Sequence, residues 1–197
     1  GTGRGAQLGV LIKNGAALEQ AGRLTTLAVD KTGTLTTGKP VLTGISVLDA
    51  EGSATDRTVD GLDETALLTL AAALEARSEH PLALALINAG RERNCPPCPV
   101  EDVEVSPGLG IAGTVLLNNQ NYVVAVGNRA FMRERGLEAS GAVDAQLAAL
   151  AEAGQTPLLL SVGAAGAARL AGILALADAL RPESPAVVAR LHAMGVR

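Results

Sequence analysis

The spacing of apolar residues in the middle and at the end of the chain predicts helices. After Asp63, the expected N-cap, leucines recur three and four residues apart, which is the period of one helix face. Pro81 suits the first position of a second helix, which should run to about Arg91. Ser184 is expected to cap a later helix that has Pro185 at its first position. Further helices are predicted at residues 13–22, 129–135 and 143–153.

Short apolar and β-branched runs between these segments predict strands. They lie at residues 24–29, 41–48, 100–105, 111–117, 122–126, 157–162 and 170–176. The run 100–105 alternates between apolar and polar residues, as a half-buried strand does. The first run is expected to be buried, and a polar loop over residues 31–40 follows it. In open α/β sheets, ligands bind at that end of a strand.

The order of these elements predicts how the chain is organised. A helix and a strand come first, a mixed block with antiparallel hairpins follows, and a strand and a helix come last. We therefore expect one α/β domain, residues 1–40 and 168–197, interrupted by an inserted α+β domain, residues 41–167.

Composition narrows the classes of function. Apolar residues make up 48% of the chain, enough for a core, but there is one Phe, one Tyr and no Trp. The net charge is -4 and the basic residues are scattered, so no nucleic-acid partner is expected. No apolar stretch reaches the ~18 residues of a membrane span, and the first residues do not resemble a signal peptide. Taken alone, the chain is expected to be soluble, intracellular and monomeric.

Two cysteines, Cys95 and Cys98, lie in a Cys-Pro-Pro-Cys loop. This spacing fits a redox pair or half of a zinc site. A structural zinc site has four ligands, and His80 and His192 are the only histidines in the sequence. We expect an inert loop, with soft-metal binding or a labile disulfide as the alternatives.

The clearest chemistry lies in the run Asp-Lys-Thr-Gly-Thr-Leu-Thr, residues 30–36. An Asp after a strand can be the nucleophile of phosphoryl transfer and form an aspartyl phosphate. The N–H groups and the hydroxyls of Thr32 and Thr34 can hold phosphate oxygens. Because a carboxylate repels a phosphate, Mg²⁺ is needed to neutralise the charge. All seven residues match the phosphorylation motif of P-type ATPases, and the chain resembles that family.

The resemblance implies roles for this loop. Asp30 would accept the phosphoryl group, and Lys31, Thr32, Gly33 and Thr34 would complete the catalytic loop. Asp30 and Thr32 would supply part of a Mg²⁺ site. In the related haloacid dehalogenase phosphatases, the place of Thr32 is held by a second Asp that acts as general acid and base. The Thr implies a phosphoenzyme that persists longer.

Three more motifs resemble the nucleotide-binding domain of heavy-metal P-type ATPases. In Ser-Glu-His-Pro, residues 78–81, His80 would stack on or bond to adenine. The Gly-x-Gly loop at residues 108–110 would let the backbone approach the nucleotide. A Gly-Asn pair follows the strand that ends at residue 126. The implied nucleotide-binding residues are Glu75, Glu79, His80, Pro81, Gly108, Gly110, Ile111, Gly127 and Asn128.

The resemblance covers essentially the whole chain. It implies a partial haloacid-dehalogenase-like (Rossmann-like) phosphorylation domain, interrupted by an α+β nucleotide-binding domain with an antiparallel sheet flanked by helices. ATP and Mg²⁺ would be the cofactors, and membrane helices and an actuator domain the partners. The chain would be a cytoplasmic portion of an inner-membrane or plasma-membrane pump. That pump would export a heavy-metal cation, with copper(I) slightly favoured over zinc, cadmium and lead.

Two other functions stay open: a haloacid-dehalogenase-type phosphatase, and a non-catalytic nucleotide- or metal-binding module. The phosphatase hypothesis is weakened because Thr32 stands where those phosphatases have their second Asp. The Thr-Gly-Asp and Gly-Asp-Gly loops of P-type ATPases do not occur in these 197 residues. We therefore expect the isolated chain to bind ATP but to turn it over poorly.

Overall fold

A computed structural model describes residues 2–7, 9–10, 14–55, 57–164 and 167–197. The chain divides into two compact units, each described here by itself. The terminal unit comprises Gly1–Thr36 and Leu180–Arg197, and the sheet unit comprises Thr37–Ala179. The second boundary lies between Ala179 and Leu180, at the end of the strand at residues 169–180, whereas the sequence placed it between residues 167 and 168. This strand is hydrogen-bonded into the sheet.

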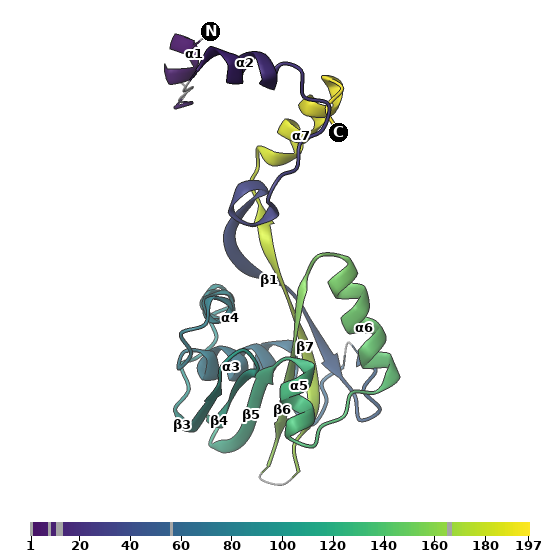
Figure 1. The fold of residues 1–197 in the computed structure, drawn as a ribbon. Helices are drawn as coiled ribbons and strands as arrows, with labels where there is room; N and C mark the ends of the chain where they lie inside the picture. The colour runs from purple at the N-terminus through teal and green to yellow at the C-terminus, as the bar shows by residue number, and fades with distance from the viewer. Residues whose placement is uncertain (1, 8, 11–13, 56, 165–166) are drawn as a thin grey trace. The chain divides into compact units, whose positions relative to one another are not determined.

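One seven-stranded sheet organises the sheet unit, with the order β2-β1-β7-β6-β5-β4-β3 (Figure 1). The strands are β1 (Thr36–Leu48), β2 (Ala54–Thr55), β3 (Val100–Ser106), β4 (Gly110–Leu117), β5 (Gln120–Gly127), β6 (Thr156–Gly163) and β7 (Arg169–Leu180). From β3 to β7, each strand pairs antiparallel with the next. Asn118 and Asn119 join β4 to β5 with positive φ angles of 51° and 63°, the turn geometry that hairpins favour.

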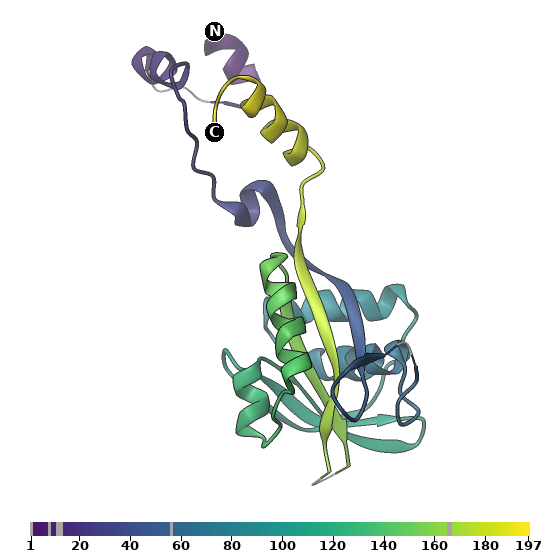
Figure 2. The same ribbon diagram turned by 90° about the vertical axis from the view of Figure 1, so that its right-hand side faces the viewer.

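Helices cover both faces of this sheet (Figures 1 and 2). The helices α3 (Glu64–Glu75) and α4 (Pro81–Glu92) lie on one face, and α5 (Arg129–Glu134) and α6 (Gly141–Glu152) lie on the other. Asp63 caps α3 as predicted, because its Oδ1 accepts from Ala66 N at 2.8 Å. The expected class, a mixed α/β fold with an antiparallel sheet flanked by helices, is confirmed.

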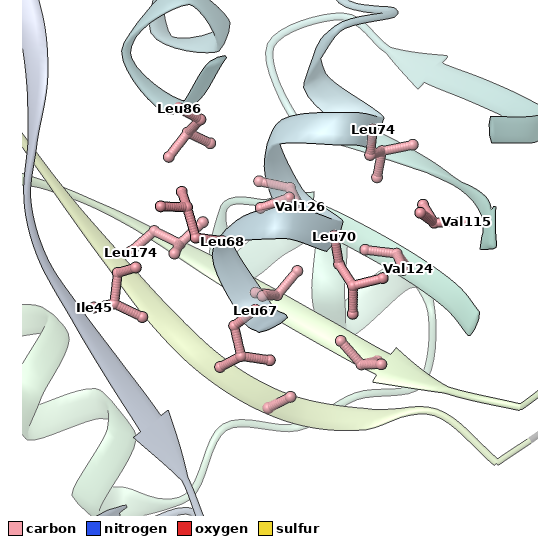
Figure 3. Close-up of a cluster of buried hydrophobic side chains, with 14 of the residues drawn as sticks. Ile45, Leu67, Leu68, Leu70, Leu74, Leu86, Val115, Val124, Val126 and Leu174 are labelled. Atoms are coloured by element: carbon pink, nitrogen blue, oxygen red, sulfur yellow. The ribbon is translucent and has the colours of Figure 1, made fainter. Parts of the chain in front are cut away.

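The larger core lies between α3, α4 and the sheet. The leucines of α3 are completely buried and face the central strands (Figure 3). Side chains two residues apart on β4 and β5, such as Val124 and Val126, point into this core, whereas Ala125 belongs to the cluster on the other face. Coverage on both faces explains why these strands are continuous apolar runs instead of alternating ones.

The strand β3 departs from the predicted burial. The strand forms at the predicted residues, but most of its side chains are exposed, whereas the alternation predicted a half-buried strand. It lies at the sheet edge, and within the described part of the chain its one partner strand is β4. The register shifts between Glu101 and Glu104, and Asp102 has a φ of 51°. Such an irregularity rotates side chains off the regular alternation and is a common feature of edge strands.

The terminal unit contains α1 (Thr2–Gln7), α2 (Gly15–Ala21), the turn η1 (Lys31–Leu35) and α7 (Ser184–Ala193). The helix expected at 13–22 is α2, and residue 13 lies outside the described residues. The buried strand predicted at Leu24–Val29 is wrong, since these residues form no strand and are exposed. Two backbone hydrogen bonds join them to Arg197: Leu27 N donates to Arg197 O, and Arg197 N donates to Thr25 O, at 2.9 Å each. A buried strand needs neighbours on both sides and a covering layer.

The predicted cap of α7 is also wrong. Glu183 is the N-cap, without a side-chain hydrogen bond, and Ser184 is the first residue of the helix. The Ser184 hydroxyl instead donates to Leu35 O at 2.8 Å. Among the helices of the described residues, none has the length and apolar character that crossing a membrane requires.

Candidate functional site

The sheet unit holds a cavity of about 620 Å³ at one end of the central strands. Its wall comes from four segments: the α3–α4 connection, the β3–β4 turn, the end of β5 and the start of β6. All nine residues predicted to bind a nucleotide line it, namely Glu75, Glu79, His80, Pro81, Gly108, Gly110, Ile111, Gly127 and Asn128. These nine residues, which are up to 53 positions apart in the sequence, therefore share one cavity.

Strand register explains this convergence. In the β4–β5 hairpin, Gly110 pairs with Gly127, so the turn before β4 lies beside the end of β5. β5 in turn pairs antiparallel with β6, with Gly127 opposite Leu159. The residues just before Leu159, Thr156–Leu158, thus reach the same end of the sheet and line the cavity. Sequence reasoning missed this segment, and only the hairpin register could have indicated it.

The imidazole of His80 is oriented by the start of α4. Its Nδ1 accepts from Leu82 N at 3.2 Å, which makes His80 the N-cap, with Pro81 following at the first turn. Ser78 Oγ accepts from His80 N at 3.2 Å and fixes the preceding loop. In the neutral ring, an accepting Nδ1 leaves the proton on Nε2, which is then a donor available to a ligand.

Glu75 is the last residue of α3 and is only 6% exposed. Burial raises the pKa of its carboxyl above the ordinary value, and a hydrogen bond with the Ser78 side chain opposes that shift. The remaining wall is largely apolar, with Leu82, Val105 and Leu158 among its residues. A carboxyl group in such a wall is a strong and selective hydrogen-bonding partner for a ligand.

The predicted catalytic residues lie together in the terminal unit, because they are consecutive. Asp30 is exposed, and its Oδ1 accepts from Thr32 N at 3.3 Å. Gly33 adopts a φ of 77°, which turns the chain back, and its N–H donates to Thr36 Oγ1 at 3.1 Å. The same hydroxyl donates to Lys31 O at 3.1 Å. Asp30, Lys31, Thr32, Gly33 and Thr34 thus form a tight exposed loop around one buried threonine, Thr36.

Residues 24–197 match the family model of haloacid dehalogenase-like hydrolases. The chain belongs to this family. Over its whole length it is also 39% identical to a copper-transporting P-type ATPase of Rhizobium leguminosarum bv. viciae, of which it covers 21%. It is 36% identical to a manganese-exporting P-type ATPase of Mycobacterium tuberculosis (strain ATCC 25618 / H37Rv), with 99% of this chain and 25% of that protein covered.

Among solved structures, this haloacid dehalogenase-like chain is similar to a zinc-transporting PIB-type ATPase in the E2.Pi state. The TM-score is 0.72 at 34% identity, with 100% of this chain and 28% of that chain covered. The chain thus spans about a fifth to a quarter of the curated relatives described above. It corresponds to one segment of heavy-metal P-type ATPases, which confirms the resemblance drawn from the motifs. The relatives are named for copper, manganese and zinc, so no single metal follows from them.

Two residues of this haloacid dehalogenase-like chain hold the Asp30 loop and were not predicted. The Arg181 guanidinium donates to Gly33 O at 3.1 Å and to Thr36 O at 3.2 Å, and the Arg181 N–H donates to Leu35 O at 2.9 Å. The Ser184 hydroxyl also donates to Leu35 O. These contacts join positions about 150 residues apart, which no local pattern in the sequence indicates.

The residues that the structure describes contain no group of three or more His, Cys, Asp and Glu side chains placed to hold a metal ion. The two predicted Mg²⁺ ligands, Asp30 and Thr32, lie two residues apart in the exposed loop, whereas a Mg²⁺ shell is usually octahedral with six oxygen ligands. Cys95 and Cys98 are both unpaired and partly buried, and they pack against the main core. Burial, with Cys95 nearby, raises the pKa of Cys98, so its neutral thiol is favoured.

Proposed function

We propose that this chain is the ATP-binding and aspartyl-phosphorylation part of an ATP-driven heavy-metal cation export pump. ATP would bind in the cavity of the sheet unit, and its γ-phosphoryl group would pass to Asp30. The observation that carries the proposal is the convergence of all nine predicted residues on one cavity of about 620 Å³. That volume lies in the range of sites for small molecules and cofactors.

The cavity has the chemistry that a purine nucleotide requires. Apolar side chains such as Ile111 and Leu158 can cover the faces of the base. Glu75 and the Nε2 of His80 supply hydrogen-bonding groups at the α3–α4 end of the wall. At the other end, Gly108 has a φ of 74° and no neighbouring atom within 4 Å of an added Cβ, so its backbone is open to a close contact.

In the proposed reaction, the Asp30 carboxylate attacks the γ-phosphorus of ATP. A bond forms between a carboxylate oxygen and phosphorus, the bond from phosphorus to the β–γ bridging oxygen breaks, and ADP leaves with that electron pair. The loop supplies backbone N–H groups and the hydroxyls of Thr32 and Thr34. Because Thr32 cannot act as a general base, hydrolysis of the aspartyl phosphate would be slow, as an intermediate in a pump cycle requires.

Mg²⁺, when bound with ATP, would neutralise phosphate charge and so lower the repulsion that Asp30 meets. Asp30 and Thr32 are the residues of this loop that would contribute oxygen ligands. The proposed parent is an integral membrane protein of the inner or plasma membrane, with this chain in its cytoplasmic portion. Its membrane helices and actuator domain would be the partners, and copper(I) is slightly favoured as the cation.

Calorimetric titration of ATP into the purified chain tests the proposal. We expect saturable binding with a Kd of about 0.1–1 mM, or about -4 to -5.5 kcal/mol. Two variants separate the role of His80 as the N-cap of α4 from the role of its Nε2 as a donor to ATP. His80→Asn keeps a good N-cap for α4 but removes Nε2, whereas His80→Ala removes both. Both variants should weaken binding about tenfold, or about 1.4 kcal/mol.

His192→Ala is the matched control, because His192 is the other histidine and lies in α7 of the terminal unit. It should leave ATP affinity unchanged. Absence of ATP binding, or binding that is indifferent to both His80 variants, would contradict the proposal and favour a phosphatase or a module without nucleotide chemistry.

A further inference from the structure

Both polar atoms of the Asn128 side chain make hydrogen bonds within the protein. Its Nδ2 donates to Gly108 O at 3.1 Å, and its Oδ1 accepts from Phe131 N at 3.0 Å. In addition, the backbone N–H of Asn128 donates to Leu109 O at 2.9 Å. Two of these hydrogen bonds tie the β3–β4 turn to Asn128, and the third caps α5.

Gly110 and Gly127 are required by the protein's own packing. A Cβ at Gly110 would collide with Val126 O and would lie 2.5 Å from the ring of Phe131. A Cβ at Gly127 would also lie 2.5 Å from that ring and 2.6 Å from Leu109 O. The space that a side chain at either glycine would take is therefore occupied by the Phe131 ring and by backbone atoms.

Phe131 is itself held firmly. It is the single Phe of the chain, is 1% exposed and belongs to the core on the α5 face of the sheet. The Arg135 guanidinium lies over its ring, 4.5 Å from the centroid. Arg135 also pairs with Glu104 of β3 at 2.7 Å. These contacts fix α5 against the strands on either side of the Gly108–Gly110 turn.

We propose that Asn128 and Phe131 are positioning residues, which shape the Gly108–Gly110 turn as a wall of the ATP cavity without touching the nucleotide. Gly108 is then the residue of the Gly-x-Gly loop that meets the ligand, and Gly110 and Gly127 act by admitting the Phe131 ring. This inference rests on the proposed function, because it assigns the cavity to ATP. It differs from the direct contact that the motif resemblance implies for Gly110, Gly127 and Asn128.

The test uses the 197-residue chain and the variant Asn128→Ser. Serine keeps an N-cap acceptor for α5 but is too short to donate to Gly108 O, and it adds no charge. Two quantities are measured: ATP affinity by calorimetry, and amide hydrogen exchange of Leu109 and residue 128 without ligand. ATP affinity should fall about three- to tenfold, and amide exchange should become about three- to tenfold faster, which is the range for one lost hydrogen bond. Phe131→Leu should change both in the same direction.

Ser140→Ala is the matched control, because it removes the cap of α6, away from the cavity. It should alter neither quantity. If affinity falls in Asn128→Ser while exchange in the ligand-free turn is unchanged, Asn128 contacts ATP directly and the inference is wrong. Faster exchange with unchanged affinity, or an equal loss of affinity in Ser140→Ala, also overturns it. If the unmodified chain binds no ATP, the proposed function itself fails, and this inference fails with it.

Discussion

At the scale of single residues, Glu75 combines a cost in folding stability with a place in the cavity wall. Because burial raises its pKa above the ordinary value of 4.5, the folded chain holds this proton more tightly than the unfolded chain does. Between pH 4.5 and the folded-state pKa, a rise in pH therefore favours unfolding. A residue that costs stability at neutral pH is typically kept for binding or catalysis.

We expect Glu75→Gln to be more stable than the unmodified chain at pH 7, because the amide carries no charge to desolvate. The advantage should shrink as the pH falls through the folded-state pKa and level off below about 4.5, where the carboxyl is neutral in both states. Urea denaturation at a series of pH values measures this. Affinity for ATP should fall in the same variant, since an N–H₂ group replaces an acceptor. A stability difference that does not vary with pH would contradict the prediction.

Arg181 should order the Asp30 loop. Arg181→Met keeps the length of the side chain but removes its hydrogen bonds to Gly33 O and Thr36 O. Two lost hydrogen bonds should lower the local opening free energy of the loop by about 1–2 kcal/mol. Hydrogen exchange of the Gly33 and Thr36 amides is the measurement, and Arg181→Lys, which retains one donor group, should be intermediate. Equal exchange in all three chains would show that Arg181 does not hold the loop.

At the scale of elements, the paired glycines Gly110 of β4 and Gly127 of β5 leave no room for a larger residue. Gly110→Ala should destabilise the chain by about 1–3 kcal/mol, because its Cβ meets the Val126 backbone and the Phe131 ring. Gly141→Ala at the start of α6 is the control: no atom lies within 4 Å of its added Cβ, and it should be neutral or stabilising by about 0.4–1 kcal/mol. Thermal unfolding of both variants tests the contrast.

The sequence predicted the elements best where local rules and packing agree. The stretch from Asp63 to about residue 163 follows the prediction to within a few residues, because caps, leucine spacing and asparagine turns act locally. The prediction failed at Leu24–Val29 and Ser184, where the outcome depends on distant partners: Arg197 in the first case and Leu35 in the second. It also missed the burial of β3, which depends on its place at the sheet edge.

The candidate site was predictable in part for a similar reason. His80, Gly108 and Asn128 belong to short motifs, so their gathering around one cavity could be anticipated from the resemblance. Thr156–Leu158 and Arg181 carry no local signal, and only strand register or a contact across the chain reveals them. Motifs also mark residues without saying how they act, as the internal hydrogen bonds of Asn128 illustrate.

At the scale of the molecule, the two units should differ in local stability. Every residue from Leu18 to Thr34 is exposed, whereas β4 to β7 contribute to cores on both faces of the sheet. Amides between residues 18 and 34 should exchange with opening free energies of about 0–2 kcal/mol, and those of β4 to β7 near the global value of about 5–15 kcal/mol. Mass spectrometry of deuterium uptake measures this, and similar protection in both regions would contradict it.

The hydrogen bonds from Arg181 to the Asp30 loop also have a consequence for synthesis on the ribosome. Gly33 leaves the ribosome 148 residues before Arg181, the residue that bonds to it. At about 5–20 residues per second, the Asp30 loop is synthesised about 7–30 s before Arg181. The hairpins β3 to β6 need only neighbours in the sequence and can form during that interval. The cavity of the sheet unit would thus form while the Asp30 loop is still without its contacts to Arg181.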